Sequence, residues 1–173
     1  MGWSLSVGAV EEGRLVVIEG GRVVTISPQH IESAPVTNGQ VFDDGDPYTA
    51  VAEQSLAFTP SERAFIVEAE CTFEIRPLLA GEVRASYALA INGSPVASTV
   101  RTIGFDPSQG ALDPNAICVQ QRRLKLRCVP GVTPGVVAGQ EVTFSAMVDQ
   151  TAGASSSLAA LGLQRSFTID EYF

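Results

Sequence analysis

The single histidine of this 173-residue chain limits the catalytic chemistry that its side chains could perform. Serine and cysteine nucleophiles are usually activated by a histidine base. Here the one candidate is His30, in a segment bounded by Pro28 and Pro35. No Gly-x-Ser-x-Gly motif accompanies it, and zinc would need more histidines or cysteines at ligand spacing. We therefore interpret His30 as a surface loop residue and predict no catalytic residue, no metal site and no cofactor.

An acidic loop at Asp43, Asp44 and Asp46, around Gly45, has the residue types of a calcium loop. An EF-hand needs a bidentate glutamate at the twelfth position of its loop. Counting from Asp43 or Asp44 reaches glutamine or serine at that position, so the EF-hand is excluded. We interpret the aspartates as turn residues, with a calcium site of another kind as the alternative.

Three glutamates, Glu68, Glu70 and Glu74, alternate with apolar residues and share one face of a predicted strand. A pair of carboxylates can hydrolyse a glycosidic bond when it flanks a sugar-binding cleft. Aromatic residues, which such a cleft would use, make up only 7% of this chain. We interpret the glutamates as the solvated face of a sheet.

A basic stripe lies at Arg122, Arg123, Lys125 and Arg127, where three of the cations alternate with apolar residues. It is either a solvated strand face or a surface that forms salt bridges with carboxylates of a neighbouring subunit. The net charge of −8 disfavours nucleic acid, which binds proteins through basic groups, and also disfavours anionic lipid. We predict contact with another protein and none with nucleic acid or membrane.

The first residues of the chain also alternate, with Trp3, Leu5 and Val7 separated by small residues. An apolar face of this kind at a chain end needs something to pair with. We predict that it docks on a partner protein or a neighbouring protomer. The alternative is a strand of the chain's own sheet.

The three cysteines, Cys71, Cys118 and Cys128, contain no Cys-x-x-Cys pair. Two of them fall on apolar strand faces, where a thiol behaves as a small hydrophobic group. We predict buried, reduced thiols and assembly in a reducing cytoplasm. A Cys118–Cys128 bridge across a hairpin is the alternative.

The elements that would position these residues are β-strands. Alternation is clearest over Arg63–Ile75 and Glu82–Asn92, where odd positions are apolar and even ones mostly polar, as in antiparallel strands with one wet face. The apolar face of the first run comprises Phe65, Val67, Ala69, Cys71, Phe73 and Ile75. Further strands are predicted at Leu15–Ile18, Arg22–Ile26, Gln54–Thr59, Val96–Ile103, Ile117–Val129 with a bulge, Val142–Val148 and Leu161–Ile169.

These strands predict an all-β protein, a jelly-roll-like antiparallel β-sandwich over residues 56–173. Residues 1–55 are rich in turn residues from Ser27 to Tyr48, and we predict an extended N-terminal arm that docks on a neighbour. Charged residues make up only 17%, against about 25% in typical domains. Neighbouring subunits could cover part of such a surface, although a small-residue β-protein has the same composition. Neither a signal peptide nor a membrane span is predicted.

The order of features from Arg63 to Phe173 resembles the trimeric jelly roll of the tumour-necrosis-factor and complement-globular-head type, which recurs in bacteriophage virion proteins. The matching pieces are the long alternating strand, the strand that runs into the Asn92-Gly93 turn, the Val136–Phe144 strand entry and the terminal Ser166–Tyr172 strand. The Val136–Phe144 segment resembles the "Leu-x-Ala-Gly-Asp-x-Val" motif with which a strand of this family begins, but this chain has Gln140 where aspartate is usual.

The resemblance implies a homotrimer whose last strand, with Phe167, Ile169 and Tyr172, lies near the threefold axis. It also implies a non-enzymatic phage structural protein. We favour a capsid decoration (cement) protein that is assembled in the host cytoplasm and binds the major capsid protein or another virion protein on the head exterior. The alternative is a head- or tail-fibre knob that recognises cell-surface glycan.

Overall fold

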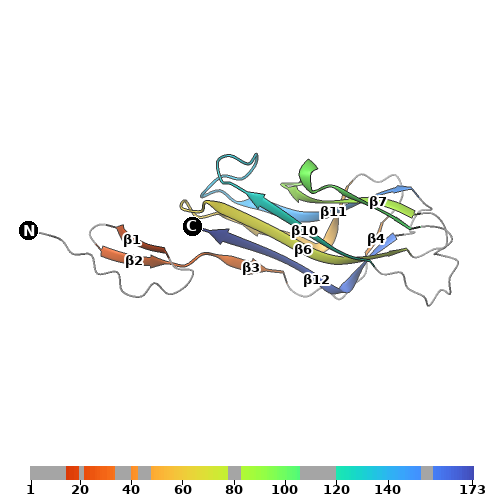
Figure 1. The fold of residues 1–173 in the computed structure, drawn as a ribbon, viewed down its shortest axis with the longest axis horizontal. Helices are drawn as coiled ribbons and strands as arrows, with labels where there is room; N and C mark the ends of the chain where they lie inside the picture. The colour runs from red at the N-terminus through yellow and green to blue at the C-terminus, as the bar shows by residue number, and fades with distance from the viewer. Residues whose placement is uncertain are drawn as a thin grey trace, which may run out of the picture.

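The computed structural model describes residues 15–19, 22–33, 40–42, 48–77, 83–105, 120–152 and 158–173 (Figure 1). Several residues that the sequence singled out lie outside this described part of the chain. They are Trp3, Leu5, Val7, Asp43, Asp44, Asp46 and Cys118. The predictions made for these residues therefore stay predictions.

Two five-stranded antiparallel sheets form the body of the protein. In the first sheet, which we call the β6 sheet, β10 (Gln120–Cys128), β6 (Ile66–Pro77) and β12 (Leu158–Tyr172) lie side by side; β3 (His30–Glu32) and β4 (Gln40–Phe42) both pair with β12. In the second, the β7 sheet, β5 (Thr49–Phe58), β11 (Val142–Ala152) and β7 (Val83–Ile91) are neighbours; β8 (Ser94–Pro95) and β9 (Arg101–Phe105) both pair with β7.

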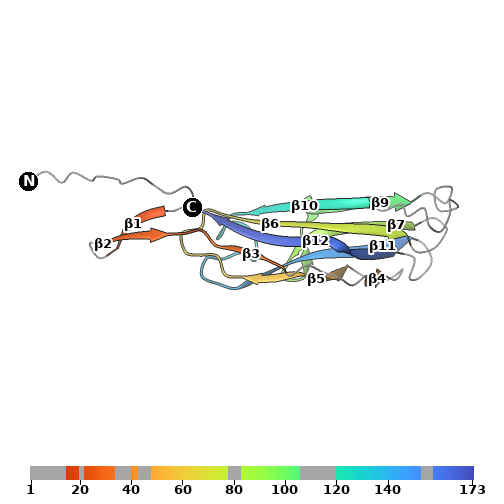
Figure 2. The same ribbon diagram turned by 90° about the horizontal axis from the view of Figure 1, so that it is seen from below.

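The chain alternates between the two sheets, as a jelly roll requires. From β5 in the β7 sheet it crosses to β6, returns for β7 to β9, crosses again to β10, returns for β11 and ends in β12. The long strands run along the long axis of the molecule in both views (Figures 1 and 2). The predicted all-β, jelly-roll-like sandwich is thus confirmed.

Alternate apolar side chains of the two sheets meet to form one core. The β6 sheet contributes fully buried residues such as Cys71, Phe167 and Ile169, and the β7 sheet contributes Leu89 and Phe144. Removing this apolar surface from water is the main favourable term in folding. The strand predicted at Val142–Val148 is confirmed as part of β11, and four of its alternate residues are buried: Val142, Phe144, Ala146 and Val148.

Phe65 departs from the predicted alternation, because its side chain is 69% exposed. β6 begins one residue later, at Ile66, and the preceding residues form a turn in which the Ala64 N–H donates to the Ser61 carbonyl. Side chains alternate between faces only within a strand. The assignment of Phe65 to the buried face was therefore wrong.

The strand predicted at Val96–Ile103 is interrupted by a 3-10 turn, η1 (Ala97–Thr99). The buried Thr99 hydroxyl accepts a hydrogen bond from the Leu89 N–H at 3.0 Å, so a side chain occupies the place of a ladder partner. A threonine hydroxyl can replace backbone pairing in this way. Only the part from Arg101 onward forms β9.

The bulge predicted in Ile117–Val129 is absent from the described part of β10, because its pairing with β6 is continuous from Gln120 to Cys128. Register shifts occur elsewhere. One separates Ser145 from Met147 in the pairing of β11 with β5, and another separates Leu161 from Ser166 in the pairing of β12 with β6.

The N-terminal third of the chain contributes to the sandwich and also extends beyond it. β3 and β4 pair with β12, while β5, which pairs with β11, contains the predicted boundary between residues 55 and 56. The predicted hairpin is present as β1 (Leu15–Glu19) and β2 (Arg22–Ile26), which form a separate two-stranded sheet. That residues 1–55 act as a docking arm stays a prediction.

A buried carboxyl group attaches the start of β3 to the sandwich. Glu171 is only 2% exposed, and its Oε1 accepts from the Gln29 N–H at 3.1 Å while its Oε2 accepts from the Ser61 N–H at 3.0 Å. The Glu171 N–H also donates to the Gln29 carbonyl at 3.1 Å. This one side chain therefore joins three segments that are far apart in the sequence.

We expect Glu171→Gln to lower the free energy of unfolding by about 1–3 kcal/mol, because an amide has one acceptor oxygen and would turn its NH2 group toward a buried N–H donor. The urea midpoint of the full chain measures this. The control is Asp170→Asn on the opposite face of β12, where the exposed pair with His30 contributes at most about 1 kcal/mol. Equal losses in the two variants would contradict the anchoring role of Glu171.

Candidate assembly surface

The outer face of the β6 sheet carries rows of polar side chains across its strands. The strand register aligns Arg127 of β10 with Glu68 of β6, Glu68 with Asp170 of β12, and Asp170 with His30 of β3. The adjacent row on this face comprises Lys125, Glu70, Thr168 and Glu32. Directly opposed side chains on one sheet face are near enough to interact. The outer face of the β6 sheet therefore carries charges of both signs that lie in register across its strands.

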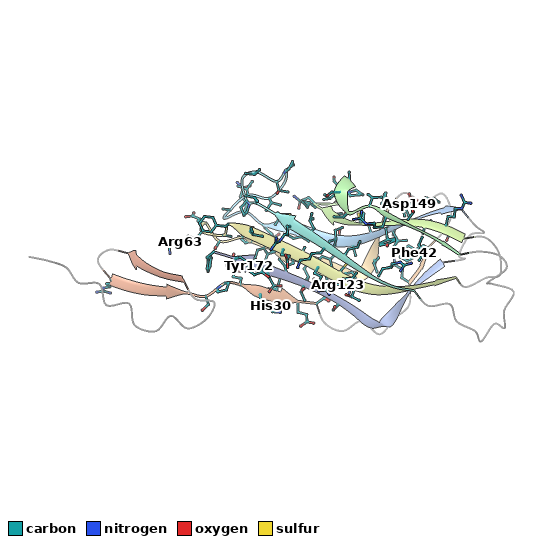
Figure 3. All side chains as sticks on the ribbon, viewed as in Figure 1. His30, Phe42, Arg63, Arg123, Asp149 and Tyr172 are labelled. Atoms are coloured by element: carbon teal, nitrogen blue, oxygen red, sulfur yellow. The ribbon has the colours of Figure 1, made fainter. Side chains whose placement is uncertain are left out.

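Three of the four cations of the basic stripe bind carboxylates of their own chain. Lys125 Nζ lies 2.7 Å from Glu68 Oε1, and Arg127 Nε lies 2.9 Å from Glu68 Oε2. One residue pair further along the strands, Arg123 Nη2 lies 2.7 Å from Glu70 Oε1 (Figure 3). The charge of the stripe is thus balanced largely within the β6 sheet. Contact of Arg122, Arg123, Lys125 and Arg127 with a neighbouring subunit stays a prediction.

Glu68 lies on the predicted face but is not solvated as we expected, because its side chain is only 8% exposed. Burial by itself raises the pKa of Glu68. The hydrogen bonds and charges of Lys125 and Arg127 outweigh this effect, so its pKa lies below the usual 4.5. The two cations therefore hold a covered carboxylate in its ionised form.

His30 occupies the end of the first row opposite to Arg127, and its Nδ1 lies 2.6 Å from Asp170 Oδ1. The histidine side chain is 56% exposed. The prediction of a surface residue is therefore confirmed, although His30 starts a strand and is not in a loop. Its partner Asp170 lies in register with Glu68, so two carboxylates are neighbours with cations on one side and the imidazole on the other.

The terminal strand presents different residues to the core and to the surface. Phe167 and Ile169 are fully buried between the two sheets of their own chain, so their side chains do not reach an outer surface. Tyr172 is 45% exposed. Burial raises the pKa of Tyr172, as do the charges of Glu68 and Asp170. If β12 borders a trimer axis, the contact must be made by its outward residues, Ser166, Thr168, Asp170 and Tyr172.

A set of exposed hydrophobic side chains, which we call the hydrophobic end, lies at one end of the sandwich. It comprises the large hydrophobic residues that are exposed among those whose side chains the structure describes: Phe65, Val129, Val132, Val137 and Tyr172. They come from the start of β6, the end of β12 and the loop from β10 to β11, and the Phe65 N–H donates to the Tyr172 carbonyl at 2.8 Å. Arg63 and Tyr172 mark this end in Figure 3.

The loop from β10 to β11 is held by its own hydrogen bonds. The Val132 and Thr133 N–H groups donate to the Val129 carbonyl at 3.0 and 2.8 Å, and the Thr133 hydroxyl accepts from the Val129 N–H at 2.8 Å. Gly131 and Gly135 adopt positive φ angles of 78° and 79°, which glycine tolerates best. The loop thus presents Val132, 76% exposed, on a defined backbone.

Exposed hydrophobic side chains that gather in one place commonly mark an interaction surface. No pattern in the sequence predicted that these residues form one set. A partial signal was present, because Val129, Val132 and Val137 stand within a Pro/Gly-rich loop that has no alternation to bury them. Their proximity to Phe65 and Tyr172 depends on the pairing of distant strands.

The two cysteines in the described ranges are free and buried, as predicted. Burial raises the pKa of Cys71 to about 12 and that of Cys128 to about 11. Both thiols are therefore protonated at neutral pH and poorly nucleophilic. Within the same ranges, no group of three or more potential ligand residues is placed to hold a metal ion. The described segments also contain no helix with the length and hydropathy to cross a membrane.

No known protein family and no curated protein matches the sequence. Among solved structures, the chain is similar to a protein of the infectious bursal disease virus (IBDV) particle, with a TM-score of 0.50 and 9% identity. The match covers 96% of this chain but only 36% of the viral one. This chain therefore spans about a third of that protein, and the likeness shows the fold alone.

Two weaker structural matches were also found. A VP2 subviral particle of the same virus has a TM-score of 0.35 at 10% identity, over 96% of this chain and 41% of the other. The C-terminal domain of the sugar-binding protein EclA has a TM-score of 0.38 at 10% identity, over 84% of this chain and 81% of the other. All are remote in sequence.

We expect Glu68→Gln to lower the free energy of unfolding by about 1–2 kcal/mol at neutral pH, because it removes charge-assisted hydrogen bonds to two exposed cations. A pKa that is lower in the folded than in the unfolded protein stabilises the fold above pH 4.5, and this contribution is lost as the pH falls below it. Urea unfolding between pH 3 and pH 7 should therefore show a smaller loss of stability toward acid in Glu68→Gln than in the parent.

The matched control is Glu141→Gln, which removes one carboxylate at an exposed position. We expect it to change stability by no more than about 0.5 kcal/mol and to leave the acid dependence as in the parent. An unchanged acid dependence in Glu68→Gln would contradict the role given to the Lys125 and Arg127 pairs.

Proposed function

We propose that this chain is a non-enzymatic virion structural protein, a capsid decoration (cement) protein of a bacteriophage that acts as a homotrimer. The observation that carries the proposal is the jelly-roll fold itself, which over 96% of the chain is similar to that of a protein of the IBDV particle. Because that likeness concerns the fold alone, the role in a capsid rests additionally on the surfaces of this chain.

Two surfaces support an adhesive role. The hydrophobic end gathers the exposed Phe65, Val132 and Tyr172, which gain free energy when a partner covers them. The outer face of the β6 sheet is broad and polar, and its charges are largely paired within the chain. A partner can cover such a face without leaving many buried charges unpaired, since an unpaired buried charge is strongly unfavourable.

In this proposal the outward residues of β12 and the basic stripe border the subunit contacts. Arg123 and Arg127 have side chains 69% and 68% exposed, so each retains donors for a carboxylate of a neighbouring subunit or of the shell. The N-terminal Trp3, Leu5 and Val7 would dock on a major capsid protein or another virion protein at the head exterior.

The mechanism would be mass action. A protein that binds the assembled shell but not its opened form stabilises the shell by the free energy of binding, RT ln(1 + [L]/Kd), where [L] is the concentration of free protein. No chemical step is needed, and many weakly stabilising contacts add up over the repeated sites of a capsid. A trimer would suit the local threefold axes of an icosahedral lattice.

The test compares heads assembled with and without this protein in the virus that encodes it. We expect heads that lack the protein to be less resistant to heat and to low salt than complete heads. Added purified protein should restore this resistance. Electron microscopy of the complete particles should show the protein lying on the shell.

Normal head resistance together with lost adsorption to cells would contradict decoration and support the fibre-knob alternative. A purified chain that stays monomeric at micromolar concentration would contradict the trimer. Turnover of any substrate that vanishes on replacing one polar side chain would contradict the non-enzymatic role.

A further inference from the structure

Among the described strands, the β1–β2 hairpin has no pairing partner outside itself. Its two strands pair only with each other, whereas every other described strand belongs to one of the two sheets of the sandwich. In both views the hairpin lies beyond the end of the sandwich near the C-terminus (Figures 1 and 2). An isolated two-stranded hairpin is at best marginally stable in water. Some further contact is therefore needed to stabilise it.

The composition of the hairpin shows which kind of contact that is. Seven of its ten strand residues are leucine, valine or isoleucine. The register assigns Leu15, Val17, Val24 and Ile26 to one face and Val16, Ile18 and Val23 to the other. Strands that are apolar on both faces are typical of buried strands. The hairpin thus has the composition of an interior element, although it lies outside the core.

The attachment of the hairpin restricts where it can go. Gln29 is fixed beside Glu171, because its N–H donates to the Glu171 carboxylate and its carbonyl accepts from the Glu171 N–H. Only Ser27, Pro28 and Gln29 connect β2 to β3. Three residues span at most about 10 Å. Because β3 runs antiparallel to β12, the chain that precedes β3 continues past the end of β12, away from the sandwich. The hairpin is therefore held beyond the same end that carries the exposed hydrophobic residues.

The hydrophobic end is not covered by the hairpin of its own chain. Phe65 is 69% exposed and Val132 is 76% exposed in the structure that contains the hairpin. The described part of each chain thus has one apolar hairpin that pairs with no other described strand and one exposed apolar surface, both at the same end. In a closed ring of identical copies, each hairpin can cover the end of the next copy, so that no hairpin and no surface is left over.

We propose that the β1–β2 hairpin of one copy packs against the hydrophobic end of a second copy of this chain. The contact buries Phe65 and Val132 of one copy under Val and Ile residues of the other. It rests on the homo-oligomer of the proposed function and not on the capsid. It also gives residues 15–26 a role that differs from the shell docking proposed for Trp3, Leu5 and Val7.

Disulfide trapping tests the proposal on purified full-length protein. A tagged copy with Val24→Cys and an untagged copy with Val132→Cys are co-expressed, both in a Cys118→Ser background; Cys71 and Cys128 are buried. Under mild oxidation we expect a covalent heterodimer that carries one of each copy. The control pair replaces Val132→Cys with Ala97→Cys, an exposed position on η1 outside the hydrophobic end, and should give no heterodimer.

Placing Val24→Cys and Val132→Cys in one chain distinguishes a hairpin that packs on a second copy from one that packs on its own chain. A disulfide that forms only within the doubly substituted chain would show that the hairpin covers its own chain's end, and would overturn the proposal. The absence of a disulfide from both arrangements would overturn it as well. Neither result depends on whether the protein binds a capsid, so failure here is distinguishable from failure of the decoration role.

Solution mass provides the second measurement. We expect Val132→Ser and Val24→Ser each to raise the dissociation constant of the oligomer at least about tenfold, and the combined variant to raise it little further, because both changes disrupt one contact. Ala97→Ser should leave the dissociation constant unchanged. If Val132→Ser left the oligomer intact but abolished binding to heads, the occupant of the hydrophobic end would be a shell protein and the proposal would be wrong.

Discussion

The pairing of β6 with β12 is the interaction on which the rest of this structure depends. It pairs Ile66 with Tyr172 and Ala69 with Ile169, residues that are far apart along the chain. β10 is added to one side of this pair and β3 and β4 to the other, so the whole β6 sheet is built on it. Closing a loop of this length carries a conformational entropy penalty before any contact repays it. The pair persists because its inner face supplies much of the apolar core.

The two faces of that strand pair explain how the surface of the protein is divided. On the inner face, Cys71 and Phe167 are neighbours that pack against the β7 sheet. On the outer face, Glu68 and Asp170 are neighbours of like charge, an arrangement that is stable because Lys125 and Arg127 bind Glu68 and His30 lies against Asp170. The charges of this face are thus satisfied mainly within the chain. Affinity for partners therefore has to come largely from elsewhere.

The apolar groups that could supply such affinity are concentrated at the end of the sandwich. Strand ends and a Pro/Gly loop meet there, and Phe65, Val132 and Tyr172 extend beyond the core that the two sheets enclose. The hairpin that precedes β3 is apolar on both faces and lies beyond the same end (Figure 1). A single end that carries both features would account for the proposed self-association and would leave the broad polar face for contacts of lower affinity. This division suits a protein proposed to form trimers on a shell.

The sequence by itself determined where most of the long strands lie and which of their faces is buried, but it did not predict the short strands β3 and β4. The alternation at Val67, Ala69 and Cys71, or at Val142, Phe144 and Ala146, is a local property that a short run of neighbouring residues reveals. It predicted the all-β sandwich, the buried thiols and the hairpin, but it failed at Phe65 and Thr99, where a turn replaces the strand. Tertiary structure alone decided which carboxylates bind Lys125 and Arg127, and that Phe65 lies beside Tyr172. Those contacts join residues more than fifty positions apart, and they form because distant strands pair in the folded chain, whereas the alternation within one strand does not specify which strand lies beside it.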